Sequence, residues 1–189
     1  MRTLSIAAIM AALALPAAAE DFTPLLQGFL DAEIRAWADD PILINAINAQ
    51  NTRFANLTLP EIEELDRTWR AEIGQADTPT ISPIMQNSAA DFLRERVEAS
   101  AGVITEIFIM DSHGLNAAVS SPTSDMWQGD EAKFTETYPK GADATHFGDV
   151  EFDESSQIFQ GQISIPLVDQ ATGEVVGAMT VGVNAEALM

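Results

Sequence analysis

The stretch VITEIFIMDSHGLNAAVSSPTSDMWQGDEAKF, residues 103–134, decides the fold of this chain. Its first apolar run ends in the turn Asp111–Gly114 and is followed by a second run at Leu115–Ser120, a pattern typical of an antiparallel strand pair. The C-terminal stretch QISIPLVDQATGEVVGAMTVGVN, residues 162–184, repeats this pattern around the turn Asp169–Gly173. Together the two stretches predict an antiparallel sheet.

The first and last predicted strands differ in the residues on their faces. Residues 103–110 are apolar on both faces apart from Thr105 and Glu106, which predicts a strand buried on both sides. In the last predicted strand, residues 175–183, the even positions hold mostly small side chains. Small side chains permit close approach of either a helix or a ligand, and we favour a helix on this face.

The strand predicted at residues 157–168 has one polar face. Gln160, Gln162 and Ser164 alternate with apolar residues, so they share a face that either meets solvent or lines a wet cavity. Pro166 lacks a backbone N–H, so we expect it at a sheet edge or a bulge.

Upstream, apolar residues recur at helical spacing. Thr23-Pro24, Asp40-Pro41 and the capping-box sequence Thr58-Leu59-Pro60-Glu61 predict three helix starts. A further helix is expected to start at Ser82-Pro83, with an apolar stripe that reaches Val97, and to be closed by Gly102. The predicted fold is therefore α+β, with an N-terminal helical arm at residues 20–102 packed on a sheet at residues 103–189, the two forming one domain.

Residues 1–19 have the features of a signal peptide. Arg2 precedes an apolar core at Leu4–Leu15, and small residues at 16–19 suit cleavage before Glu20. A core of this length is shorter than the roughly 20 residues of a membrane span, so we expect an exported, periplasmic protein without membrane insertion after cleavage.

Composition excludes several classes of partner and site. The formal net charge of −20 disfavours nucleic acid and anionic lipid surfaces as partners. The absence of Cys excludes disulfides and thiolate metal sites. We find no G-x-S-x-G, H-E-x-x-H, P-loop or dinucleotide fingerprint, so we expect neither catalysis nor a cofactor. His113 falls in a predicted hairpin turn, and neither it nor His146 has a second His at helical or hairpin spacing, so we expect no metal.

Residues 103–183 resemble a Cache-type sensor domain, the extracytoplasmic relative of the PAS fold. The resemblance is carried by the strand ending in Asp111-Ser112-His113-Gly114, by the loop Ser124–Phe134, and by the closing unit Ile165–Gly177. It implies a five-stranded antiparallel sheet with a helix packed on one side. It also implies a small ligand on the other side, beneath the loops between the second and fourth strands.

Two departures from this family shape the functional expectation. Amino-acid-binding Cache domains carry an Arg-x-Trp-Tyr pattern at this loop, whereas here Trp127 is followed by Gln128 and no Arg precedes it. Receptors of the family continue into a membrane span and an output domain, whereas this sequence ends at Met189. We therefore expect the signal to pass to a separate membrane sensor or transporter protein.

The segment 121–153 is too long for a hairpin and is the expected binding region. Trp127 could stack on a ligand or simply fix the loop to the core, and its neighbours Asp130 and Lys133 share that ambiguity. An aromatic ring near acids suits an ammonium group, so an amine-bearing small molecule is the ligand hypothesis. The predicted ligand-binding residues are Trp127, Asp130, Lys133, Asp149 and Ser164. The alternative is a protein-interaction module with a vestigial pocket, whose acidic face docks a basic partner.

Overall fold

The computed structural model describes residues 22–153 and 158–189. The predicted signal peptide lies outside the described residues. Within the described part, no helix is long and apolar enough to cross a membrane.

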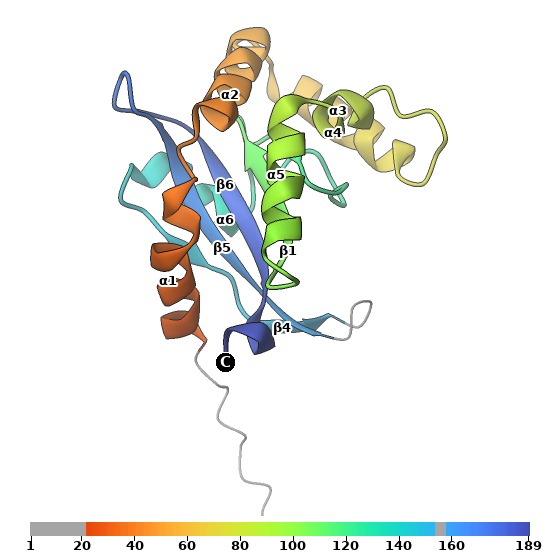
Figure 1. Cartoon of the computed structure of the whole chain (residues 1–189). Coiled ribbons are helices and arrows are strands. Elements are labelled where there is room, and N and C mark those ends of the chain that lie inside the picture. Colours follow the sequence, from red (N-terminus) through yellow and green to blue (C-terminus); the bar gives the residue numbers. More distant parts are fainter. Residues whose placement is uncertain (1–21, 154–157) are drawn as a thin grey trace, which may run out of the picture.

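Helices precede the sheet, as the sequence predicts (Figure 1). Asp40 caps the second helix by accepting a hydrogen bond from the Ile42 amide at 2.9 Å. The Thr58 amide donates to Glu61 Oε2 at 2.8 Å, which confirms the capping box. The five N-terminal α-helices are α1 (Thr23–Ala32), α2 (Pro41–Phe54), α3 (Leu59–Glu72), α4 (Ile81–Met85) and α5 (Ser88–Ala99), with a 3-10 turn η1 (Ile34–Ala36) after α1.

The prediction of one continuous helix from Ser82 to Val97 is wrong. Asn87 interrupts it: Asn87 Oδ1 accepts a hydrogen bond from the Ala90 amide at 2.9 Å, and Asn87 Nδ2 donates to the Pro83 carbonyl at 3.0 Å. One side chain thus caps the start of α5 and satisfies a carbonyl of α4.

Six described strands form a sheet five strands wide. They are β1 (Ile104–Met110), β2 (Asn116–Val119), β3 (His146–Phe147), β4 (Glu151–Asp153), β5 (Ile158–Asp169) and β6 (Glu174–Asn184). The order is β2-β1-β6-β5-β3, every pairing is antiparallel, and β4 also pairs with β5. Because β3 and β4 pair with successive parts of β5, they share one position, and the predicted five-stranded antiparallel sheet is confirmed.

Pro166 lies where its missing N–H is tolerated. It pairs with Ala178 of β6, and the described pairing of β3 with β5 involves only Ile163 and Ser164. A bulge follows between Leu167 and Val168. The prediction of an edge or bulge position is confirmed.

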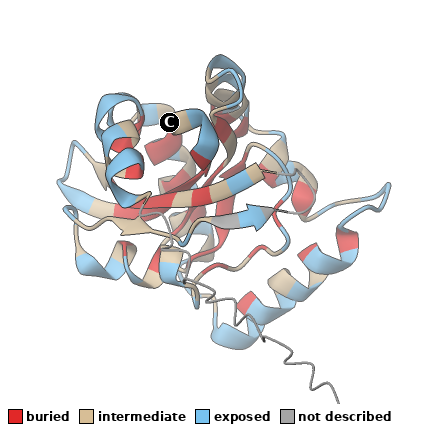
Figure 2. Cartoon of the chain, turned by 90° about the horizontal axis from the view of Figure 1, so that it is seen from below, coloured by how far each residue is buried: buried red, intermediate tan, exposed pale blue. Residues whose placement is uncertain are grey.

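Helices α1, α2 and α5 cover one face of the sheet, and the connecting segment with α6 (Ala132–Thr135) and η2 (Tyr138–Lys140) lies on the other (Figure 1). Buried residues follow the strands and the inner sides of the helices (Figure 2). The larger core joins α1, α2 and α5 to the sheet through Ile107, Ile109, Ile163, Ile165, Met179, Val181 and Val183. The smaller core joins the other face to α3, α4 and the connecting segment through Phe108, Met110, Ala178, Ile62, Trp69, Ile81, Ile84 and Phe134.

The small-residue face of β6 has two kinds of neighbour: Ala178 lies in the smaller core with residues of α3 and α4, whereas Gly182 lies beside polar side chains. Gly182 on this face is crossed by polar side chains: an added Cβ would lie 2.8 Å from Glu106 Cγ and 3.0 Å from Gln160 Nε2. Helix α2 instead approaches the opposite face, where a Cβ on Gly177 would lie 3.0 Å from Ile47 Cγ2. The missing side chain at Gly182 therefore leaves room for the side chains of Glu106 and Gln160 on this face.

Candidate functional site

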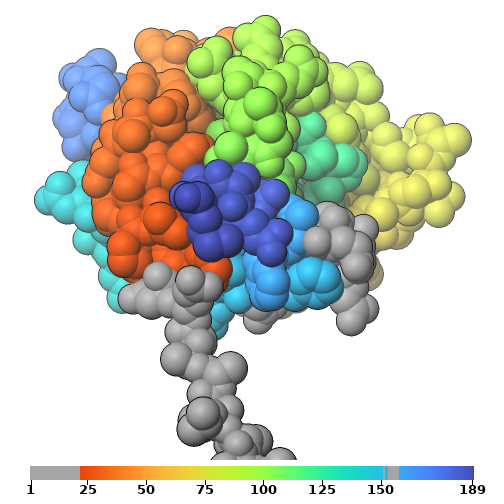
Figure 3. Space-filling model, turned by 60° about the horizontal axis from the view of Figure 1, so that its bottom comes forward, coloured from red at the N-terminus to blue at the C-terminus, as the bar shows by residue number. Residues whose placement is uncertain are grey.

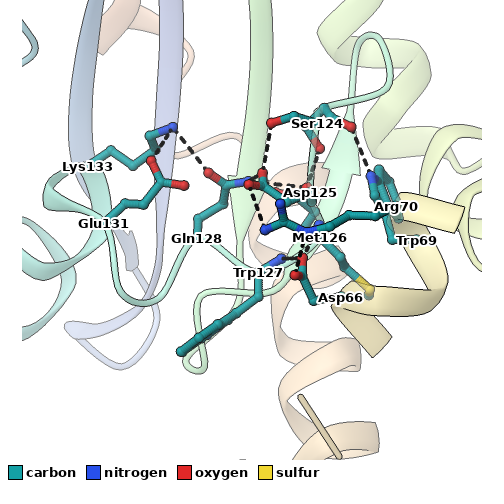
Figure 4. A network of polar contacts seen from close by, with 12 residues as sticks. Asp66, Trp69, Arg70, Ser124, Asp125, Met126, Trp127, Gln128, Glu131 and Lys133 are labelled. Atoms are coloured by element: carbon teal, nitrogen blue, oxygen red, sulfur yellow. Dashed lines mark hydrogen bonds and ion pairs between the residues drawn. The ribbon is translucent and has the colours of Figure 1, made fainter. Parts of the chain in front are cut away.

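Helix α3 holds the start of the connecting segment against the sheet. The Trp69 indole Nε1–H donates to the Thr123 carbonyl at 2.9 Å. Asp66 Oδ1 accepts hydrogen bonds from the amides of Met126 at 2.9 Å and Trp127 at 3.1 Å. These contacts fix a loop that has no regular secondary structure of its own, so the roof of any site beneath it is held by the helical arm (Figure 4).

Arg70 ties the same helix to Asp125. Its Nε lies 2.7 Å from Asp66 Oδ2, and one terminal nitrogen lies 3.2 Å from Asp125 Oδ2. The hydrogen bond and charge of Asp66, with smaller contributions from Asp125 and Asp130, raise the pKa of Arg70 above its ordinary value. Asp125 also accepts a hydrogen bond from Gln128 Nε2. Its carboxylate therefore links the loop both to α3 and to a residue three positions further along the loop.

The turn between β1 and β2 is fixed by a fully buried carboxylate. Asp111 accepts hydrogen bonds from Gln50 Nε2 at 2.9 Å and from the amides of His113 at 2.8 Å and Leu115 at 3.0 Å. Burial raises the pKa of Asp111 above its ordinary value although these hydrogen bonds act in the opposite direction. The group locks the hairpin to α2 through Gln50.

Lys133 places a positive charge beneath the loop. Its side chain is only 16% exposed, and its Nζ lies 3.0 Å from Glu131 Oε2 and 3.1 Å from Gln128 Oε1 (Figure 4). Nζ also lies 5.4 Å from the centroid of the Phe108 ring on β1, within the range of a cation–π contact. Lys133 therefore connects α6 to the polar face of the sheet.

A small cavity lies between this loop and the sheet. Its volume is about 110 Å³, and it is lined by Glu106, Phe108, Thr123, Ser124, Asp125, Gln128, Lys133 and Gln162. Small-molecule pockets usually start at roughly 300 Å³, so this cavity alone suits only a small group such as an ammonium head.

A wider hollow of about 590 Å³ shares Gln162 with the cavity. It is lined by Ala132, His146, Phe147, Gly148, Asp149, Phe152, Gln160 and Gln162. Gln160 Nε2 lies 3.4 Å from Glu106 Oε1, so the side chains of β1 and β5 meet across Gly182 at the floor of the two spaces. The cavity and the hollow together form a candidate site over the polar face of the sheet.

The structure brings two of the five predicted site residues to these spaces. Lys133 lines the cavity and Asp149 lines the hollow. Asp130 is exposed on the loop and lines neither space. Ser164 is fully buried in β5, with its Oγ 3.0 Å from Thr180 Oγ1.

Trp127 is turned away from Lys133 (Figure 4). Its indole Nε1–H donates to the His113 carbonyl at 2.9 Å, and its ring packs at the smaller core. A Cβ on Gly129 would lie 2.3 Å from the indole nitrogen, so the loop closes tightly over the ring. These contacts favour Trp127 as an anchor of the loop, and ligand binding by Trp127, Asp130 and Ser164 stays a prediction.

The sequence-based prediction of the site omitted Glu106, Asp125, Gln128 and Gln162. The polar alternation in β5 does place Gln160 and Gln162 on one face, and Glu106 is the acid in an otherwise apolar strand. Those two patterns are the signals by which this floor could have been found. In the part of the chain that the structure describes, no group of three or more His, Asp or Glu side chains is placed to hold a metal ion.

Comparison with known proteins finds similar structures but no match in sequence. No family model matches this sequence, and no curated protein matches it. The chain is similar in structure to extracytoplasmic sensor domains of histidine kinases and chemoreceptors.

Three of these structures illustrate the likeness. The sensor domain of the Vibrio cholerae histidine kinase DctB has a TM-score of 0.47 at 16% identity, over 88% of this chain and 53% of that one. The Campylobacter jejuni chemoreceptor Tlp3 with 4-methylisoleucine gives 0.42 at 13%, over 88% and 61%. The Pseudomonas aeruginosa amino-acid chemoreceptor PctC with GABA gives 0.42 at 13%, over 84% and 63%. This chain thus spans less than two thirds of each of these structures, and neither ligand is transferred to it.

Proposed function

We propose that this chain is an exported sensor module that binds a small amine-bearing ligand between the segment 121–153 and the polar face of the sheet. The observation that carries the proposal is the convergence of Glu106, Asp125 and Asp149 on two adjoining spaces that share Gln162. Carboxylates that line a partly enclosed space favour a cation, because their charges are poorly screened there.

The arrangement of charge supports an ammonium group in particular. Lys133 is already held by Glu131 and Gln128, and Asp125 is already paired with Arg70. Glu106 lines the cavity as well and accepts a hydrogen bond from Gln160 Nε2 at 3.4 Å in the floor. An ammonium group in the cavity could donate to Glu106 and to a Gln oxygen, while the body of the ligand occupies the wider hollow beside Phe147 and Phe152.

A signalling role requires export and a receiver, and both belong to this proposal. The composition of residues 1–19 supports export to the periplasm. The resemblance of residues 103–183 to Cache-type domains supports a membrane sensor or transporter protein as the partner. Because α3 holds the loop that roofs the site, ligand binding would alter the packing of the helical arm and so could be read by a protein that contacts it.

A thermal-shift screen of the purified chain against primary amines, diamines and amino alcohols tests the proposal. A ligand that binds only the folded state raises the melting temperature, by mass action. The largest shift should be lost in Glu106→Gln, which keeps the shape of the side chain, and retained in the control Glu174→Gln, which lies exposed in the β5–β6 hairpin. If no amine shifts the melting temperature, or if Glu106→Gln responds like the unaltered chain, the proposal fails.

The alternative, a protein-interaction module with a vestigial pocket, is favoured by two observations. The cavity beneath the loop is small, at about 110 Å³. Phe152 and Phe159 are 47% and 40% exposed, with ring centroids 5.2 Å apart, and form an apolar pair on the surface of β4 and β5. Absence of any amine binding, together with association of a basic protein that is lost in Phe159→Ser, would select this function instead.

A further inference from the structure

A second hollow lies on the opposite side of the molecule from the polar face, between α1, α5 and the C-terminal turn η3 (Ala185–Leu188). In Figure 3 this turn (blue) lies between α1 (orange) and α5 (green). The hollow has a volume of about 540 Å³, within the range of small-molecule sites. Its walls combine the apolar side chains of Phe29, Trp37, Ile104 and Leu188 with polar groups that include Arg96 and Ser100.

The positive charge in this hollow is Arg96. Its guanidinium carbon lies 4.8 Å from the centroid of the Phe92 ring, and Phe92 makes an edge contact with Trp37 at 6.2 Å. Arg96 Nε is buried and has no hydrogen-bond partner among the residues that the structure describes. A buried N–H donor without an acceptor is costly, so this position favours an acceptor that enters from outside.

Within the described part of the chain, Arg96 also has no carboxylate partner. Six basic residues of residues 22–153 and 158–189 form ion pairs with acids: Arg35, Arg67, Arg70, Arg94, Lys133 and Lys140. The other two in that described part are Arg53, on α2, and Arg96. Acidic residues outnumber basic ones in this chain, 29 to 9, so most arginines can find a carboxylate. The guanidinium of Arg96 stacks on a ring instead, and its N–H groups can donate to an anion that enters the hollow.

We infer that this hollow binds a monocarboxylate with an apolar body, independently of the amine site. The carboxylate accepts hydrogen bonds from the Arg96 guanidinium, which suits it in bidentate geometry. The apolar body lies against Phe29, Trp37 and Leu188. Glu33, the acid of the lining, is exposed to solvent, where its repulsion of the ligand is screened.

Calorimetric titration with octanoate, and with the neutral octanamide as its matched probe, tests the inference. The unaltered chain should bind octanoate at one site. Arg96→Met keeps the stem and removes the charge, so it should weaken octanoate about tenfold or more and leave octanamide unchanged. The control Arg53→Met removes the other unpaired guanidinium, which lies over Phe54, and should change octanoate affinity less than about twofold.

Two further variants distinguish this hollow from the amine site and from a folding defect. Lys133→Met, in the polar-face cavity, should retain octanoate binding. Ala99→Leu fills the hollow from an exposed position and should abolish the binding without lowering the melting temperature. Absence of octanoate binding, full binding by Arg96→Met or Ala99→Leu, or an equal loss in Arg53→Met or Lys133→Met would overturn the inference.

Discussion

The carboxylate of Asp66 accepts a hydrogen bond at 3.1 Å from the backbone amide of Trp127, although the two residues lie 61 positions apart in the sequence. The same oxygen accepts a second bond from the Met126 amide. A helix of the N-terminal arm therefore holds the loop that roofs the candidate site, and the two parts of the chain are linked at this point.

Removal of this link should loosen the loop. Asp66→Ala leaves two partly buried amides without acceptors and removes one of the two carboxylates that pair with Arg70, so we expect a loss of about 1–3 kcal/mol in the free energy of unfolding, measured by urea denaturation. The control Asp91→Ala removes an acid from an exposed ion pair on α5 and should cost less than about 1 kcal/mol. Equal losses in the two variants would show that Asp66 does not hold the loop.

The role of Trp127 can be separated from ligand binding. Trp127→Phe keeps an aromatic ring and removes the N–H that donates to the His113 carbonyl. If the ring anchors the loop, unfolding should become easier by about 1 kcal/mol, with ligand affinity nearly unchanged. A large loss of ligand affinity with unchanged stability would instead place the ring in contact with the ligand.

Asp111 should make stability depend on pH in a defined direction. Its pKa is raised in the folded state by burial, so its contribution is fully present below the unfolded pKa of about 4 and is lost as pH rises through the folded pKa. The difference in unfolding free energy between the unaltered chain and Asp111→Asn should therefore decrease as pH rises above about 4. Urea denaturation across a pH series measures this difference. A difference that increases with pH would contradict a raised pKa of Asp111 in the folded state.

Two glycines with opposite surroundings test the packing of the sheet. A Cβ on Gly177 would lie 2.1 Å from the Met110 carbonyl oxygen, so Gly177→Ala should destabilise the chain by about 1–3 kcal/mol or more. Gly28 in α1 has nothing within 4 Å of such a Cβ, and Gly28→Ala should stabilise by about 0.5–1 kcal/mol. Melting temperatures that move in the same direction would mean that β1 and β6 are not packed as described.

Local signals in the sequence were sufficient for the elements of this fold. The Asp-to-Gly turns predicted the two hairpins, and the capping residues Asp40 and Thr58 marked helix starts, because both depend on neighbouring residues only. The break at Asn87 was missed, since an Asn inside an amphipathic stretch is also compatible with a continuous helix. The approach of polar side chains to the small face of β6 at Gly182 was also missed, because residue size alone does not say what lies against it.

The candidate site was only partly predictable, because some of its residues meet only through contacts between distant parts of the sequence. Lys133 and Asp149 lie in a segment whose length and polarity mark it as a binding region. Glu106 becomes part of the floor through its approach to Gln160, which comes 54 residues later. Contacts between residues so far apart have no period in the sequence, so they could not be read from it.

Blocking the shared wall of the two spaces tests the central claim most directly. Gln162→Trp places a large ring where the cavity and the hollow meet, and Gln170→Trp, in the exposed β5–β6 turn, is the matched control. With the amine that gives the largest thermal shift, calorimetric titration should show binding lost in Gln162→Trp and retained in Gln170→Trp, with both chains folded. Undiminished binding by folded Gln162→Trp would place the ligand elsewhere and contradict the account.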